Sequence, residues 1–205
     1  MRWIVVFLVV ACVFNASEVF AQSGVAKGSV DGMIDWKDPW SLTPSKFKEI
    51  AEALPRKKSE RAYTAMSSGG TSVGYSIGKG FRNESGGGKM SLFEGRLPLA
   101  AISASFEADK ATVIYFRIGD TGLNAKKAKS SDIALLKAEL SKRTGDTAPK
   151  PYDQDVGGGR APVPGLQWTL GNYKVRMNEV PMFSASGERS GTGVFNVRIL
   201  RLSDN

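Results

Sequence analysis

A helical repeat of apolar residues is the clearest pattern in the chain. Apolar residues recur at the i, i+3, i+4 and i+7 positions that give a helix one apolar face, namely Phe47, Ile50, Ala51 and Leu54. Thr43 is a good N-cap, and Pro44 suits the first helical position. Leu42 precedes the cap and can pack on Phe47 as a hydrophobic staple. Pro55 stops the repeat, so the pattern predicts a helix that begins after Thr43 and ends before Pro55.

A second helix is predicted over about Asp132–Arg143. Ile133, Leu136 and Leu140 share one face, and Ser130 or Ser131 can cap the N-terminus. Gly145 is well placed as the residue that ends the helix in a left-handed conformation.

The remaining apolar segments are short and partly alternating, which is typical of strands. The predicted strands are Arg61–Met66, Thr71–Ile77, Leu97–Phe106, Thr112–Ile118, Leu166–Leu170, Tyr173–Val180 and Val194–Leu202. A tight turn over Glu107–Lys110 joins two of them as an antiparallel hairpin. Gly171-Asn172 predicts a second hairpin. The glycines at 86–88 read as a flexible break.

Two segments show neither the helical nor the strand repeat of apolar residues. Residues 146–165 contain four prolines and four glycines and predict a long loop, which is often functional or disordered. Residues 181–193 predict another loop. We therefore expect an α+β fold: a mostly antiparallel sheet of about five to seven strands, with two helices packed on one face.

The first 21 residues have the pattern of a secretory signal peptide. Arg2 precedes an apolar run over Trp3–Phe14, and Val19 and Ala21 are compact residues at the positions a signal peptidase reads. The run is too short to span a membrane. We expect cleavage after Ala21 and export to the periplasm or the extracellular medium. The alternative is a lipoprotein anchored through Cys12, because Val9-Val10-Ala11-Cys12 loosely resembles a lipobox.

Behind the signal, residues 22–35 predict a flexible leader, and residues 36–205 a single α+β domain. Trp36 and Trp40 read as an anchor that pins the N-terminus to the core. The alternative reading is an aromatic platform that binds a ligand.

Composition excludes much familiar chemistry. The 205 residues contain no His and one Cys, which lies in the signal peptide. The processed chain therefore has no Ser-His-Asp triad, no Cys-His pair and no soft metal ligand, so it lacks the usual means of nucleophilic catalysis and transition-metal binding.

The remaining catalytic patterns are weak. Ser45 and Lys48 match the S-x-x-K motif of serine penicillin-binding proteins and open a helix, as that motif does, and Ser203-Asp204-Asn205 spells the family's second motif. The third motif, K-T-G, is missing. No glycine-rich phosphate loop is complete. Paired carboxylates could hydrolyse glycosides, and the candidates are Glu94, Glu107, Asp109, Asp120 and Glu179, but nothing in the sequence pairs any two of them.

Only oxygen ligands remain for a metal. Asp153 and Asp155 before Gly157 faintly resemble a calcium loop, but Pro164 stands where its final Glu should be. Asp31, Asp35 and Asp38 form a similarly weak acidic group. We expect no cofactor.

The positive charge is the one global feature that implies a partner. The chain has 28 Lys and Arg against 20 Asp and Glu, and the net charge of +8 survives removal of the signal. Two basic groups flank the helices, and together they form the predicted binding surface: Arg56, Lys57, Lys58 and Arg61, and Lys126, Lys127 and Lys129. Such groups attract anionic polymers or lipid head groups. Export makes nucleic acid an unexpected partner, and plain solubility is the alternative explanation.

Four segments carry a resemblance to a known domain. They are Trp40–Phe47, Val113–Arg117 running into Gly119–Gly122, Gly165–Trp168 and Arg198–Leu202. Together they resemble the N-terminal α+β domain of secreted bacterial proteins that carry a papain-like (C39-like) peptidase domain. The similarity spans about residues 36–202 and implies a non-catalytic module, because the peptidase part is missing and no Cys-His residue can be carried over.

The sequence thus favours an exported, non-catalytic accessory or binding module for anionic envelope components or another exported protein. One alternative is a hydrolase of cell-envelope or extracellular polymers that acts through carboxylates or a Ser-Lys pair. Another is an adaptor that docks a partner along the edge of the 194–202 strand.

Overall fold

The computed structural model describes residues 28–67, 72–79, 84–85, 90–120, 126–158, 160–184 and 188–202. The predicted signal peptide, the lipobox at Cys12, the glycine break at 86–88 and the Ser203–Asn205 motif lie outside these residues. Within them, no helix combines the length and the apolar character needed to cross a membrane.

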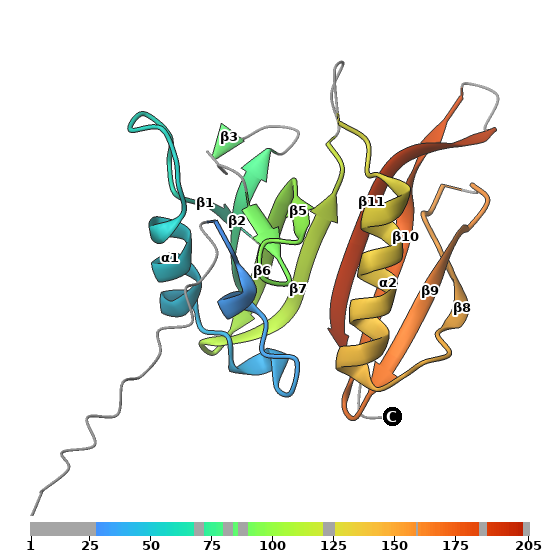
Figure 1. The fold of residues 1–205 in the computed structure, drawn as a ribbon, viewed down its shortest axis with the longest axis horizontal. Coiled ribbons are helices and arrows are strands. Elements are labelled where there is room, and N and C mark those ends of the chain that lie inside the picture. Colours follow the sequence, from blue (N-terminus) through green and yellow to red (C-terminus); the bar gives the residue numbers. More distant parts are fainter. Residues whose placement is uncertain are drawn as a thin grey trace, which may run out of the picture.

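The described chain is dominated by strands (Figure 1). Its helices are the 3-10 turns η1 (Asp31–Met33) and η2 (Pro39–Ser41) and the α-helices α1 (Pro44–Ala53) and α2 (Ser130–Thr144). Its strands are β1 (Thr64–Ser67), β2 (Val73–Lys79), β3 (Glu84–Ser85), β4 (Met90–Leu92), β5 (Leu97–Leu99), β6 (Ala101–Glu107), β7 (Lys110–Ile118), β8 (Lys150–Gln154), β9 (Val163–Leu170), β10 (Tyr173–Phe183) and β11 (Arg189–Arg201).

One large antiparallel sheet organises the fold. Its strand order is β1-β2-β6-β7-β11-β10-β9-β8, with β3 paired to β2, and β4 and β5 form a separate small sheet. The predicted α+β class and the mostly antiparallel sheet are confirmed, although the sheet has more strands than the five to seven expected.

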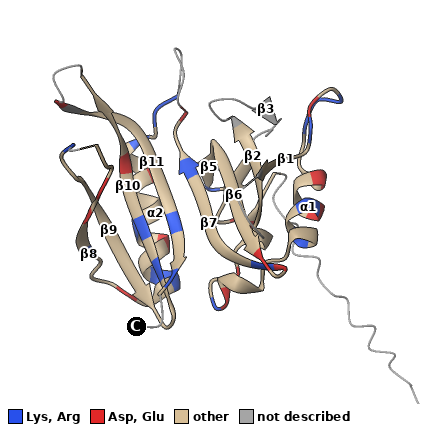
Figure 2. Cartoon of the chain, turned by 180° about the vertical axis from the view of Figure 1, so that it is seen from behind, with Lys and Arg blue, Asp and Glu red and all other residues tan. Residues whose placement is uncertain are grey.

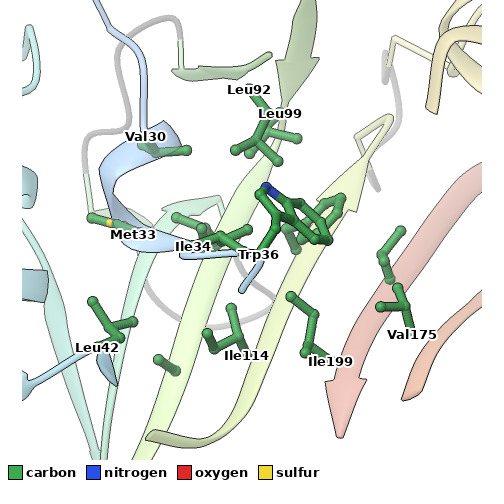
Figure 3. Close-up of a cluster of buried hydrophobic side chains, with 14 of the residues drawn as sticks. Val30, Met33, Ile34, Trp36, Leu42, Leu92, Leu99, Ile114, Val175 and Ile199 are labelled. Atoms are coloured by element: carbon green, nitrogen blue, oxygen red, sulfur yellow. The ribbon is translucent and has the colours of Figure 1, made fainter. Parts of the chain in front are cut away.

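Both α-helices lie on one side of this sheet, as the sequence predicts. Alternate residues of each strand point to that side: Ile102, Ala104 and Phe106 of β6 are buried there, and so are Val175 and Met177 of β10. They join Phe47 of α1 and Leu136 and Leu140 of α2 in one hydrophobic cluster, part of which Figure 3 shows around Ile114, Ile199 and Trp36. We call this side of the sheet the covered face.

Helix α1 forms as its sequence predicts. The Thr43 hydroxyl accepts a hydrogen bond from the Lys46 backbone N–H at 3.2 Å, which satisfies one of the free donors of the first turn. Leu42 and Phe47 are both buried. The helix ends at Ala53, ahead of Pro55.

Helix α2 begins two residues earlier than predicted. Ser130 and Ser131 lie inside its first turn, and Lys129 is the N-cap residue. The carboxylate of Asp132 accepts a hydrogen bond from the Lys129 backbone N–H at 3.2 Å, so a side chain within the helix replaces the predicted serine cap. Gly145 ends the helix at φ 70°, as expected.

Both segments predicted as long loops contain strands, so these predictions are wrong in part. Residues 150–154 of the 146–165 segment form β8, and β9 already begins at Val163. Prolines in both strands argue against strand structure in a sequence pattern. β8, however, lies at the sheet edge, where Pro151 can be accommodated because no neighbouring strand requires a backbone N–H from it on the open side. The 181–193 segment is mostly strand as well: β10 runs to Phe183, and β11 begins at Arg189.

One predicted strand is broken in two. The segment expected at 97–106 divides at Ala100, whose backbone N–H binds the carbonyl of Arg117 at 2.8 Å. β5 then pairs with β4 in the small sheet, while β6 continues in the large one. The β6–β7 and β9–β10 hairpins form where they were predicted.

The predicted flexible leader is wrong for its described part. Val30, Met33 and Ile34 are buried in the core, and Ser29 forms a parallel bridge with Ser91 of β4. The Asp31 carboxylate accepts hydrogen bonds from the backbone N–H groups of Phe93 and Glu94, each at 2.7 Å. Ordered packing therefore begins ahead of Asp35, because this clamp and three apolar side chains hold the segment down.

Trp36 and Trp40 are anchors rather than a ligand platform. Their exposed fractions are 9% and 5%. Tyr173 connects them to the sheet: its hydroxyl donates to the Trp36 carbonyl at 2.6 Å, and its ring meets Trp40 edge-on. Burial raises the pKa of Tyr173 to about 12, so this donor keeps its proton at any physiological pH.

Candidate binding surface

The second side of the large sheet, which we call the open face, carries the most distinctive polar arrangement. In the described part of the chain, the helices and the small sheet pack on the covered face, and no such element lies on the other side (Figure 2). Strand alternation sends every second side chain to the open face. Alternation thus selects the residues of the open face, and the strand registers show which of them are neighbours.

One line of polar residues crosses the whole open face at right angles to the strands. Consecutive pairs in the strand registers join Lys150, Gln167, Arg176, Arg198, Tyr115, Ser103, Ser76 and Thr64. We call this line the polar row. It contains no carboxylate, and its three cations lie on the β8–β11 half, whereas hydroxyl groups occupy the β7–β1 half.

The two central arginines lie side by side on β10 and β11, where Figure 2 shows neighbouring basic segments. Arg176 Nε donates to Gln167 Oε1 at 2.8 Å, and its guanidinium stacks over the Tyr152 ring with its carbon 4.9 Å from the ring centroid. Within the described part of the chain, no carboxylate forms an ion pair with Arg176 or Arg198. The ion pairs found there join Lys46 to Glu49, and Arg96 and Arg143 to Glu139, all away from this face.

Two half-buried tyrosines frame the arginines. Burial raises the pKa of Tyr115, and the nearby charges of Arg117 and Arg198 oppose that rise. Burial likewise raises the pKa of Tyr152, opposed by Arg176 and Arg198. Both phenols therefore stay neutral, and both bind asparagine side chains: Tyr115 donates to Asn196, and Tyr152 donates to Asn178 at 3.3 Å.

A glycine makes the contact between Tyr152 and Asn178 possible. Gly165 lies between Tyr152 and Asn178 in the register, and a Cβ at that position would stand 2.4 Å from the Tyr152 ring. Tyr152 thus lies flat across the backbone of β9. It supports the Arg176 guanidinium from the side and fixes its position.

The predicted Ser-Lys pair is not assembled. Ser45 is exposed on α1, and its hydroxyl lies 3.4 Å from that of Thr43. The Lys48 ammonium instead lies 4.5 Å from the Tyr75 ring centroid. A hydrogen bond to Tyr75 raises the pKa of Lys48, whereas a lysine that acts as a general base needs a lowered one.

The candidate carboxylates are scattered. Glu94 and Asp109 are exposed in turns, and Glu107 is exposed at the end of β6. Glu179 accepts a hydrogen bond from the Gly193 backbone N–H at 2.7 Å. A cavity of about 250 Å³ lies beside Glu179, which is the one acidic residue in its wall; Val163, Pro164, Val180, Pro181, Ser190 and Gly191 line the rest. A single carboxylate of this kind does not provide the acid and base of a glycosidase.

The candidate metal ligands have structural roles instead. Asp155 accepts from the Gly157 N–H at 2.8 Å, Asp35 accepts from the Lys37 N–H at 2.9 Å, and Asp38 accepts from the Trp40 N–H at 3.3 Å. Asp153 is exposed on the edge strand β8. Among the described residues, no three acidic side chains gather in a way that could hold a metal ion.

The two predicted basic groups do not form one surface. Arg56, Lys57, Lys58 and Arg61 follow α1, whereas Lys126, Lys127 and Lys129 precede α2, and both views of the molecule place them apart. All seven side chains are exposed. Each group can therefore contribute to the general charge, but the two do not converge on one ligand.

The predicted docking edge is absent. β11, which contains residues 194–201, lies in the middle of the sheet between β7 and β10, and both of its edges are hydrogen-bonded. The edge strands are β1 and β8 instead. An adaptor mechanism through the terminal strand is therefore excluded.

The polar row leaves a signal in the sequence, in the alternation of polar and buried residues along β10 and β11. Lys174 and Arg176 alternate with buried residues along β10, and Asn196 and Arg198 do so along β11. The alternation marks them as one face of each strand. Only the register shows that Arg176 and Arg198 are direct neighbours.

Comparisons of the chain with protein-family models, curated proteins and solved structures found no match.

Proposed function

We propose that this protein is an exported, non-catalytic binding module that holds an anionic envelope component on the open face of its sheet. The observation that carries the proposal is the pair Arg176 and Arg198, adjacent on neighbouring strands with no described carboxylate to neutralise them. Like charges opposite one another destabilise a sheet. An anionic partner would relieve that repulsion and would gain charge-assisted hydrogen bonds.

The same charge pattern disfavours the other obvious occupant, a second copy of the chain. Two copies packed with their cationic halves face to face would bring two sets of the same cations together. Lys174 adds to them in the next line of the open face. Like-charge contacts of this kind oppose association. Charge complementarity thus favours an anionic partner.

Export is part of the proposal and rests on the apolar run Trp3–Phe14 and the compact residues before Gln22. Expression of the full chain in a bacterial host, followed by fractionation and N-terminal sequencing, tests it. We expect an exported product that begins at Gln22. A product blocked by lipid at Cys12 would support the lipoprotein alternative, and an unprocessed cytoplasmic product would contradict export.

The binding test compares two variants with equal loss of charge. Arg176→Gln/Arg198→Gln removes the central pair, and Lys57→Gln/Lys58→Gln removes two exposed lysines after α1. The measurement is the salt concentration at which each protein leaves immobilised heparin, a sulfated polysaccharide, because binding through charges weakens with salt. We expect the arginine variant to elute at distinctly lower salt than the lysine variant and the wild type. Equal shifts for the two variants would mean that net charge alone causes retention, which overturns the proposal.

The module also fits the resemblance to an accessory domain of secreted peptidases. In that setting it would bind an envelope component and leave chemistry to another chain. This remains a prediction, and identification of a co-secreted catalytic partner by cross-linking of the exported protein would support it.

A further inference from the structure

We infer that the ligand is a linear acidic polysaccharide that lies across the strands, along the polar row; this inference rests on the proposed function and specifies its ligand. The row crosses eight strands in seven steps of about 4.8 Å each, or about 34 Å in total. That length suits several consecutive sugars of an extended chain rather than one small anion. The side chains along the row then decide what kind of polymer fits.

The charged half of the row suits carboxylates. A guanidinium presents paired N–H groups that match the two oxygens of a carboxylate. Gln167 fixes one edge of Arg176 and Tyr152 supports its plane, so little rotamer freedom remains to be lost on binding. An extended pyranose chain advances by about the spacing between neighbouring strands, so successive sugars could face successive side chains of the row.

The other half of the row suits hydroxyl groups. Ser103, Ser76 and Thr64 follow Tyr115 in the register, and all three are half-buried. The adjacent positions on β2 and β6 include Gly74 and Ala101. The Met66 side chain lies over Gly74 and is 37% exposed, so this half presents hydroxyl groups beside one apolar side chain. An extended sugar chain, which has both hydroxyl groups and apolar C–H surfaces, could lie on it.

The same residues disfavour a single-stranded nucleic acid. Such a ligand needs open aromatic faces on which its bases can stack. The Arg176 guanidinium already occupies the ring of Tyr152, and Tyr115 is half-buried with its hydroxyl bound to Asn196. The row thus presents guanidinium edges and hydroxyls.

The test measures binding of galacturonate oligomers, from dimer to octamer, to the full processed chain by calorimetry at low salt. For the wild type we expect affinity to rise with length until the oligomer covers the row and then to level off. Arg198→Gln should weaken every oligomer about tenfold, as expected for loss of one charge-assisted contact.

Ser103→Glu tests whether the ligand extends along the hydroxyl half of the polar row. The variant places a carboxylate there, which would repel an acidic polymer. We expect it to abolish the gain in affinity that the wild type shows with oligomer length. Ser103→Gln controls for side-chain size. Ser131→Glu, an exposed position on α2 at the other side of the sheet, controls for net charge. Circular dichroism of each variant confirms that it is folded.

The outcomes separate the inference from the proposed function. If Arg198→Gln weakens binding but length has no effect, and Ser103→Glu behaves like Ser131→Glu, the arginines bind anions without a polymer track and the inference is overturned. If Arg198→Gln binds every oligomer like the wild type, the proposed function fails as well. Tighter binding of an oligothymidylate than of a galacturonate oligomer with equal charge would overturn the polysaccharide class.

Discussion

The covered and open faces of the large sheet are built from alternate residues of the same strands, and they differ in almost every property. Along β10, Val175 and Met177 are buried on the covered face, while Lys174 and Arg176, which alternate with them, face outward. Along β11, Val197 and Ile199 alternate with Asn196 and Arg198 in the same way. Neighbouring residues of one strand therefore belong to different faces, so we expect that the core and the proposed binding face can be changed separately.

The largest expected effect on stability comes from a substitution that creates a cavity on the covered face. Trp168 of β9 is fully buried, and its indole N–H donates to the Ser141 hydroxyl of α2 at 3.0 Å. Trp168→Ala should lower the free energy of unfolding by about 3–5 kcal/mol, because it leaves a cavity and an unpaired hydroxyl. Urea denaturation measures it. The exposed neighbour Thr169→Ala is the control, and similar losses in the two variants would contradict the assignment of faces.

The ion pairs of the buried Glu139 with two partly exposed arginines on the covered side give the next largest effect on stability. Glu139 of α2 accepts from Arg96 at 2.7 Å and from Arg143 at 3.2 Å. Burial raises the pKa of Glu139, but the hydrogen bond and charge of Arg96 and the charge of Arg143 outweigh it, so the pKa lies below its ordinary value of 4.5. Glu139→Gln should lower the free energy of unfolding by about 1–3 kcal/mol at pH 7.

The pH dependence of that variant follows from the direction of the shift. A carboxyl group with a lowered folded-state pKa stabilises the fold above its unfolded pKa, and this contribution disappears as the pH falls through the folded pKa. The difference in the free energy of unfolding between the wild type and Glu139→Gln should therefore be largest at pH 7 and should become small at pH 3. Urea denaturation midpoints at the two pH values measure it. Glu49→Gln, in the exposed pair with Lys46, should change little at either pH. A gap that persists at pH 3 would mean that packing, not charge, causes the loss.

The cap of the first covering helix gives a smaller effect. Thr43→Ala removes the side-chain acceptor for the Lys46 N–H and should lower the free energy of unfolding by about 1 kcal/mol. Thr43→Ser keeps the acceptor and should restore most of it. Thermal denaturation distinguishes the two variants, and equal melting temperatures for them would show that the cap bond is unimportant.

The smallest effect on stability is expected on the open face. Arg198→Gln should change the free energy of unfolding by no more than about 0.5 kcal/mol, because it relieves repulsion from Arg176 and breaks no described ion pair. Its urea midpoint should therefore match that of the wild type while its binding is weakened. A loss near that of Glu139→Gln would mean that Arg198 holds the fold together and that the two faces are not separable.

Local patterns were sufficient to predict both helices, two hairpins and the α+β class. The Thr43 cap, the Pro55 stop and the Gly171-Asn172 turn each act within a few residues, so they are visible in the sequence. β8 was missed because Pro151 argues against a strand unless that strand is known to be an edge. The central position of β11 could not be predicted, because strand order depends on contacts between distant segments.

The dependence of strand order on distant contacts also explains why the candidate site could not be predicted from the sequence. Sequence analysis favoured runs of neighbouring basic residues, such as Arg56, Lys57 and Lys58, because a run is visible without a fold. The polar row takes one residue from each of eight strands, and only the register brings Lys150 and Thr64 into one line. A binding surface on a sheet is therefore spread through the sequence in a way that no local window reveals.

The clamp at Asp31 has a consequence for how the protein can be tethered. The Gly28 carbonyl accepts from the Ser91 N–H at 3.0 Å, so the chain enters the fold beside β4, among elements that pack on the covered face. A tether joined directly to Gly28 would therefore start on the side opposite the polar row. Such a tether would leave the row facing away from its point of attachment, free to meet a ligand across the intervening space.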